Sequence, residues 1–272
     1  IPVFEEQTGG AAAAMVASLA GFDTEEPVLA QLEGIARTSP SRKLSVYAAG
    51  AGFELSEELE YLAWRAAEPN IFFNPRFMAP AMPRLEDREI RFMVMRDEAD
   101  DRSRLRLLMP FSVERPGIGI GPEILRAWSS PFAPLGTPLV DRDDPVGVFE
   151  DMLDILGRKH LKMPEILVIP DIAARGPVAS ALRIAAIGRN LPVLATGEKE
   201  RAILKTGEEP DSYLKQAVTP HHLRGYNRLL RRLGELGEVT FGEWREPGDI
   251  RRRTEEFLAL ESQGWKGRKG TA

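Results

Sequence analysis

The chain has 272 residues, of which 43% are hydrophobic and 28% are charged, and its formal net charge is −5. This length and composition predict a globular protein with a substantial core, in one large domain or two smaller ones. The acidic balance argues against nucleic acid as the partner. Because the chain has no cysteine, disulfides, thiolate catalysis and Cys-ligated metal sites are excluded. No stretch is long and apolar enough to predict a transmembrane segment, and we expect a cytoplasmic location.

Residues 1–45 are rich in Ala, Gly, Ser, Thr and Pro, which predicts a loosely ordered arm with one short helix at residues 11–20. Glu5 and Glu6 precede the Ala-rich run, where an export signal would carry basic residues. We therefore expect this arm to be something other than a secretion signal, and the folded body to begin near residue 46.

Residues 46–210 show the patterns of a first domain. Ser56 is a suitable N-cap for a helix that ends at Pro69. The apolar runs at 90–95 and 105–111 predict two strands of an antiparallel hairpin with a long polar loop between them. A connection rich in Gly and Pro follows, interrupted by a short apolar segment at 124–128.

The pattern then changes to alternating helices and strands. Helices are expected over 146–156 and from Pro177 onward, and strands over 166–169, 192–195 and 201–205. A strand, a helix and a strand in close succession predict a crossover unit with parallel strands. Together with the hairpin, this gives an α/β fold with a mixed, partly parallel sheet flanked by helices.

Residues 211–272 are predicted to form a linking helix and the beginning of a second domain. The helical pattern is interrupted at Pro220 and ends at Gly237, and a strand is expected over 238–244. A last amphipathic helix then runs from Asp249 to Gly264.

Hydrolase and metal chemistry have little support. The sequence has no G-x-S-x-G elbow and no H-E-x-x-H pair. Its three histidines are His160 and the adjacent His221 and His222, which cannot share one helix face. We therefore expect no metal cofactor, and a solvated or capping role for His160.

Two other features leave alternatives open. Four arginines, Arg224, Arg228, Arg231 and Arg232, lie beside the leucines of the helix after Pro220. They form either a solvated face near the helix C-terminus or a contact for phosphate groups. The C-terminal end of the strand at 166–169 could hold a nucleotide sugar near Asp171, because open α/β sheets bind ligands at that edge.

Four segments, taken in order, resemble the acetyltransferases of the CelD (cellulose biosynthesis) type, which belong to the GNAT superfamily. These segments are WRAAEPNIFFNPRF, FAPLGTPLVDRDDP, HHLRGYNRLLRRLGELGEV and EEFLALESQGWKGRKGTA. The last one is similar to the signature that opens the second domain in that family.

The resemblance implies a tandem pair of GNAT-like α/β units, related to Fem-type transferases, of which this chain holds the N-terminal part. It implies N- or O-acyl transfer from acetyl-CoA or another acyl-CoA to a sugar or polysaccharide precursor, with the catalytic unit largely beyond Ala272. The chain alone is then expected to be inactive. The alternative is a non-catalytic GNAT-like binding or scaffold module that assists exopolysaccharide or cellulose synthesis. No catalytic residue is carried over, and the substrate or cofactor groove is expected near Trp265, Lys266, Arg268, Arg228 and Arg232.

The motif R/Q-x-x-G-x-G/A cradles the CoA pyrophosphate in GNAT enzymes through backbone N–H groups. The nearest run here is 115–121, but Ile118 stands where the motif needs its first glycine, and Pro116 and Pro122 remove two N–H donors. We therefore interpret this run as a turn-rich connection after a strand.

Overall fold

The computed structural model describes residues 32–37, 41–99, 102–117, 119, 121–202, 207 and 209–270. The chain divides into two compact units, residues 1–199 and residues 200–272. The division falls somewhat before the boundary that the sequence predicts at residue 210, and each unit is described by itself.

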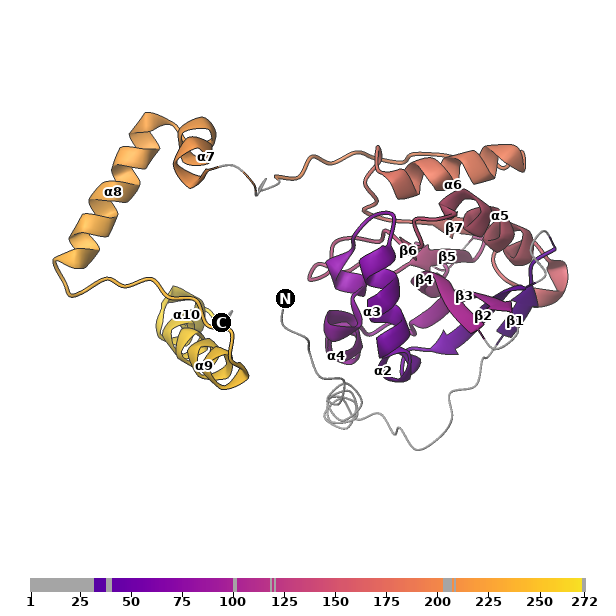
Figure 1. Cartoon of the computed structure of the whole chain (residues 1–272), viewed down its shortest axis with the longest axis horizontal. Coiled ribbons are helices and arrows are strands. Elements are labelled where there is room, and N and C mark those ends of the chain that lie inside the picture. Colours follow the sequence, from indigo (N-terminus) through magenta and orange to yellow (C-terminus); the bar gives the residue numbers. More distant parts are fainter. Residues whose placement is uncertain are drawn as a thin grey trace. The chain divides into compact units, whose positions relative to one another are not determined.

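The first unit is built on one mixed sheet (Figure 1). Its strands, in the described part of the chain, are β1 (Leu32–Ile35), β2 (Arg42–Ala48), β3 (Arg91–Ala99), β4 (Arg102–Glu114), β5 (Ile124–Ala127), β6 (Leu139–Val140) and β7 (Ile166–Val168). The spatial order is β1-β2-β3-β4-β5-β7, and β6 pairs with β4. All pairs are antiparallel except β5 and β7, which are parallel. The predicted α/β class with a mixed, partly parallel sheet is confirmed.

Helices cover both faces of this sheet (Figure 1). One face carries α2 (Ala51–Glu54), α3 (Ser56–Arg65), the 3₁₀ turn η1 (Ile71–Phe73) and α4 (Pro75–Leu85). The other carries α5 (Pro145–Leu156) and α6 (Pro177–Gly188), with the 3₁₀ turn η2 (Lys159–Leu161) after α5. The result is a three-layer α/β/α arrangement.

The core follows from the alternation of side chains along the central strand β3. Phe92 and Val94 face the layer of α3 and α4, whereas Met93 and Met95 face the layer of α5 and α6. All four side chains are fully buried. Burial of each contributes about 2 kcal/mol. A strand covered on both faces has a continuous apolar sequence, which is why this run is easily recognised.

A β-bulge interrupts β4 at Arg106. Met95 pairs with Leu107 and Arg96 pairs with Leu105, so Arg106 has no partner residue on β3. The extra residue lets Leu105 and Leu108 face the same layer, and it turns the Arg106 side chain toward the acidic residues at this end of the sheet.

Local sequence signals start the helices. Asn74 caps α4 by accepting from the backbone N–H of Arg76 at 3.0 Å, and Pro75 follows as the first helical residue. Asp144 caps α5 in the same way, through the backbone N–H of Gly147 at 3.1 Å. Each cap directly precedes a proline, so the side-chain cap and the proline both mark the start of the helix.

Several sequence predictions need correction. The strands β1 and β2 occupy residues 32–35 and 42–48, so the end of the predicted arm is part of the sheet; residues 1–31, with the expected helix at 11–20, lie outside the described residues. The hairpin strands run on to Ala99 and Arg102, which pair with each other, so the expected long loop is wrong.

The predicted crossover is also assigned to the wrong strands. Residues 192–195 are extended but form no strand, while most of the expected strand at 201–205 lies outside the described residues. The parallel pair is instead β5 and β7, joined through α5.

In the second unit, the regular elements of the described residues are helices (Figure 1). It contains α7 (Pro210–Ala217), α8 (Pro220–Gly234), α9 (Pro247–Gln263) and α10 (Trp265–Arg268). The predicted break before Pro220 is confirmed, and Thr219 caps α8 there. The expected strand at 238–244 is not formed.

Candidate functional site

Three of the predicted groove residues, Trp265, Lys266 and Arg268, lie together in α10. Gly264 ends α9, and α10 begins at the next residue and packs against α9. The Trp265 ring is 60% exposed, with the ammonium group of Lys269 5.3 Å from its centroid. Lys266 is paired with Glu261 of α9. An indole surrounded by basic groups can contact an anionic ligand, so these residues remain a prediction that the geometry permits.

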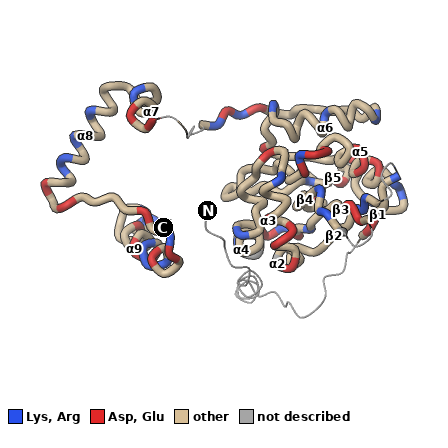
Figure 2. Tube along the Cα trace, viewed as in Figure 1, with Lys and Arg blue, Asp and Glu red and all other residues tan. Residues whose placement is uncertain are grey.

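The other two predicted residues, Arg228 and Arg232, lie in α8. This helix carries basic residues along its length and no acidic residue (Figure 2). Both guanidinium groups are exposed. The structure shows no packing of α8 on α9 or α10 comparable to that between α9 and α10, so it does not join the arginines with Trp265 into one groove.

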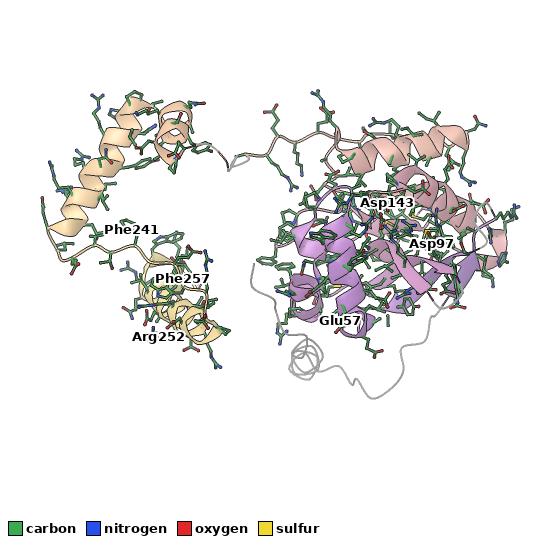
Figure 3. The ribbon with its side chains drawn as sticks, viewed as in Figure 1. Glu57, Asp97, Asp143, Phe241, Arg252 and Phe257 are labelled. Atoms are coloured by element: carbon green, nitrogen blue, oxygen red, sulfur yellow. The ribbon has the colours of Figure 1, made fainter. Side chains whose placement is uncertain are left out.

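No side chain in the four helices of the second unit is buried. Most of the large apolar residues of this unit lie exposed, among them Phe257 of α9 and Phe241 of the segment between α8 and α9, which Figure 3 labels. On α8 the leucines and the arginines lie on opposite sides, as expected for a strongly amphipathic helix.

Glu68 occupies the N-terminus of α6, at the sheet edge where we considered a nucleotide sugar. The Oε2 atom of Glu68 accepts from the backbone N–H of Val178 at 3.3 Å, within the first turn of α6. A Cβ atom on Gly176 would collide with the Glu68 carboxylate. Free N–H groups at a helix N-terminus are what binds a phosphate, and here a carboxylate of the same chain already contacts them.

The glycine-rich run is a connection between strands, as its sequence predicts. It leaves β4 after Glu114 and reaches β5 at Ile124. Gly117, Gly119 and Gly121 all have positive φ angles, which glycine adopts without steric cost.

The charged residues at the end of the sheet beside the bulge form an ionic cluster that the sequence analysis did not identify. It joins Arg42, Arg65, Arg104 and Arg106 with Asp97, Asp141, Asp143, Asp144 and Asp151. Asp97 and Asp143 are labelled in Figure 3. The signal in the sequence is the acidic run that directly follows the apolar pair of β6.

Asp141 is the centre of this cluster. Its carboxylate is buried and accepts from Arg104 at 2.6 Å and from Arg65 at 3.3 Å, and Arg106 lies 3.6 Å away. Burial alone would raise the pKa of Asp141, but the backbone N–H of Asp143 and the two donating guanidinium groups outweigh it and lower that pKa. Because this one carboxylate links an arginine of α3 to two arginines of β4, the cluster ties a helix layer to the sheet.

A second, part-buried set lies at the opposite end of β4. Glu86 accepts from the indole N–H of Trp128 at 2.8 Å and from Arg88 at 2.6 Å, and Arg88 also donates to Glu114 at 2.9 Å. Burial opposes ionisation of Glu86, but the hydrogen bonds from Arg88 and Trp128 lower its pKa to about 2. These contacts fix Trp128 in the core.

The surface over α3, η1 and α4 has a groove with aromatic and polar walls, which we call the Trp64 groove. Its volume is about 410 Å³, and it is lined by Glu60, Ala63, Trp64, Pro69, Asn70, Ile71, Asn74 and Arg76. Sequence reasoning did not predict it, although the segment that resembles the family supplies most of its lining. The signal was the combination of an aromatic residue with two asparagines, Asn70 and Asn74, around the turn at Pro69.

A basic depression of about 480 Å³ lies where α5 and α6 end. It contains His160 of η2, with Arg158 and Arg189 both paired to Asp154 at 2.7 and 3.4 Å. The carboxylate of Asp154, its pKa lowered first by the hydrogen bond from Arg158, holds the two guanidinium groups together. His160 is therefore in a solvated position at a helix end, as its sequence context predicts.

Within the described residues, no group of three acidic or histidine side chains is arranged to hold a metal ion. In the same part of the chain, no helix has both the length and the apolar character to cross a bilayer. Comparison with known proteins gives no match for this chain among family models, curated proteins or solved structures.

Proposed function

We propose that this chain belongs to an acyl-CoA-dependent N- or O-acyltransferase of the cytoplasm, an acetyltransferase of the GNAT type whose acceptor is a sugar or a polysaccharide precursor. The observation that carries the proposal is the arrangement at the end of α9. There Gly264 stops the helix, and an exposed indole and three basic side chains, Lys266, Arg268 and Lys269, follow within one turn.

The chemistry that such an enzyme needs from its protein is mainly positioning. A CoA thioester is already activated, so the enzyme holds the acceptor amine or hydroxyl against it and stabilises the developing oxyanion. Lys266 and Arg268 supply positive charge for the CoA phosphates, and Trp265 supplies a flat surface for an adenine ring or a sugar.

The second candidate is a non-catalytic GNAT-like module that assists polysaccharide synthesis. Glu68 favours it, because this carboxylate fills the helix N-terminus that would otherwise be free to meet phosphate in the first unit. Under the first proposal, the same observation assigns CoA binding to residues outside the first unit.

Calorimetric titration with acetyl-CoA separates the two candidates. We expect the full encoded protein to bind acetyl-CoA, and the double change Trp265→Ala with Lys266→Ala to weaken binding about tenfold or more. Arg251→Ala is the matched control, because Arg251 is an exposed cation of α9 that pairs with Glu255 of the same helix. Undiminished binding by the double variant excludes the α10 site, and absence of binding by the unchanged full protein supports the non-catalytic module.

A further inference from the structure

Two large apolar side chains stand exposed on the walls of the Trp64 groove. Trp64 is 72% exposed and Ile71 is 71% exposed. Tyr61, one helical turn before Trp64, is also 54% exposed, and its ring lies 6.3 Å from that of Trp64. Single exposed apolar residues are common, but two on the walls of one concave surface, with a third beside them, indicate a site that a ligand covers.

The Trp64 ring is held in place from one side. The guanidinium of Arg142 lies 5.4 Å from the ring centroid and donates to the backbone carbonyl of Trp64 at 2.8 Å. Arg142 does not line the groove. The indole therefore has a cation near its ring, and Trp64 is one of the residues that line the groove.

The polar wall carries donors and acceptors in balanced number. Arg76 and Glu60 form a two-point ion pair, with Nε to Oε1 at 2.6 Å and Nη2 to Oε2 at 3.2 Å. The Asn74 side chain uses its oxygen to cap α4, and its amide N–H groups have no acceptor among the residues that the structure describes. Asn70 is different, since it donates to the carbonyls of Leu135 and Thr137 and so fixes the floor.

We propose that the Trp64 groove binds a neutral saccharide. A pyranose ring has a face of C–H bonds that packs on an aromatic ring, and a rim of hydroxyl groups that both donate and accept. Glu60 accepts from such hydroxyls, while Arg76 and Asn74 donate to them. The saccharide is the acyl acceptor only if the proposed function is correct, but its binding requires no acyl-CoA.

Other ligand classes fit the groove less well. The single cation, Arg76, is neutralised by Glu60, so a phosphate or a nucleic acid gains little from the site. An apolar peptide segment would cover Trp64 and Ile71. It would also remove water from the Glu60–Arg76 ion pair and the Asn74 amide, and it would offer no hydrogen bonds in place of those made to water.

The test is saturation-transfer NMR on the full chain with cellobiose, N,N′-diacetylchitobiose and maltose as probes. We expect transfer to the ring protons of at least one disaccharide, a loss of affinity of about tenfold or more in Trp64→Ala, and partial retention in Trp64→Phe. Trp244→Ala is the matched control, since Trp244 is an exposed tryptophan of the second unit and is expected to leave the signal unchanged. Because Trp64 is mostly exposed, its replacement leaves the core intact, which circular dichroism checks.

Absence of transfer to all three disaccharides, or equal affinity of the unchanged chain and Trp64→Ala, overturns the proposal. Concentration-dependent dimerisation that Trp64→Ala abolishes also overturns it, because the surface is then a protein interface. Saccharide binding by a protein without acyltransferase activity supports the groove while refuting the enzymatic function. Acetyl-CoA binding without saccharide binding supports the proposed function and refutes the saccharide site in the groove.

Discussion

Asp141 is the salt-bridge partner of three arginines from two different layers of the first unit. Arg65 comes from α3, whereas Arg104 and Arg106 come from β4. Removing one partner from a buried ionic group leaves uncompensated charge, which costs more than the pair contributes. Loss of this carboxylate therefore leaves three arginines without their shared counter-charge.

The change Asp141→Asn is expected to lower the free energy of unfolding by about 3–5 kcal/mol, because three guanidinium groups lose their shared counter-charge. Urea unfolding followed by circular dichroism measures it. Asp143→Asn is the control: Asp143 contacts Arg65 and Arg104 but is half-exposed, and we expect a much smaller loss. Equal losses in the two variants would contradict the assignment of Asp141 as the centre.

Glu86 gives the stability a defined pH dependence. Its pKa is about 2 in the folded chain, below the ordinary value of 4.5. Its ionisation therefore stabilises the fold fully above pH 4.5, and this contribution is lost as the pH falls toward 2. It is on the order of 3 kcal/mol.

Glu86→Gln is accordingly expected to lower the free energy of unfolding most at neutral pH. The difference in unfolding free energy between the unchanged chain and this variant should shrink from pH 7 to pH 4 and again to pH 3. Urea unfolding at the three pH values measures it. A difference that stays constant over this range would show that Glu86 has an ordinary pKa in the folded chain.

At the scale of the elements, the N-terminus of α6 is capped by a side chain from a distant segment of the chain. Glu68 lies between α3 and η1 in the chain, yet its carboxylate caps α6. Changing it to Ala is expected to cost about 1 kcal/mol through loss of the cap. The same change frees the N–H groups of the first turn for an added anion.

We therefore expect sodium phosphate to raise the thermal midpoint of Glu68→Ala more than that of the unchanged chain, compared at matched ionic strength with sodium chloride. Glu150→Ala is a suitable control, because Glu150 is an acidic residue of α5 near the other end of α6. An identical response of all three proteins to phosphate would show that Glu68 does not block an anion site.

The sequence predicted the elements whose signals are local. The start of α8 follows from Pro220, and the β3–β4 hairpin follows from its apolar runs. The predicted cap of α3 is wrong, because Ser56 is the first residue of the helix and Leu55 precedes it without a side-chain cap. The short strands β1 and β2 were missed because residues 1–45 have the composition of an arm, although Leu44 and Val46 show the alternation of a strand. Residues 192–195 were wrongly assigned to a strand, because an apolar run becomes a strand only where a neighbour supplies hydrogen bonds.

The site was harder to predict than the fold. Trp265 and Lys266 were identified from a resemblance, and the structure places both in one short helix. The ionic cluster depends on residues that are far apart in sequence, such as Arg42 with Asp151, and no spacing rule reveals such pairs. The Trp64 groove lies within residues 60–76, but which of these side chains stay exposed depends on how α3, η1 and α4 pack on the sheet. The bulge at Arg106 is likewise visible only in the register of two strands.

At the scale of the whole molecule, the two units differ in how their apolar residues are used. The first unit buries two clusters, one on each face of its sheet, whereas the helices of the second have no buried side chain. Backbone amides in packed elements exchange their hydrogens only when the whole unit unfolds, whereas those of uncovered helices exchange through local unfolding.

Hydrogen exchange is therefore expected to be slowest in β3 and β4 and faster by several orders of magnitude in α8 and α9. Mass spectrometry of peptides from the intact chain measures this difference. Exchange in α8 as slow as in β3 would contradict it and would show that a surface covers the leucines of that helix in solution.

The sheet order has a consequence for how the chain reaches this structure. The strands β1 to β5 lie side by side in the order in which they occur in the sequence, so each needs only a connection to its predecessor. β7 pairs with β5 only after the chain has passed through β6 and α5. Local pairings form fastest, since distant ones bear a larger loop-closure entropy. The β3–β4 hairpin, whose paired residues lie close in sequence, is therefore expected to form first and to show high φ-values for its core residues. The β2–β3 and β5–β7 pairs join distant residues, such as Ala48 with Arg91 and Ile124 with Ile166, and are expected to form later.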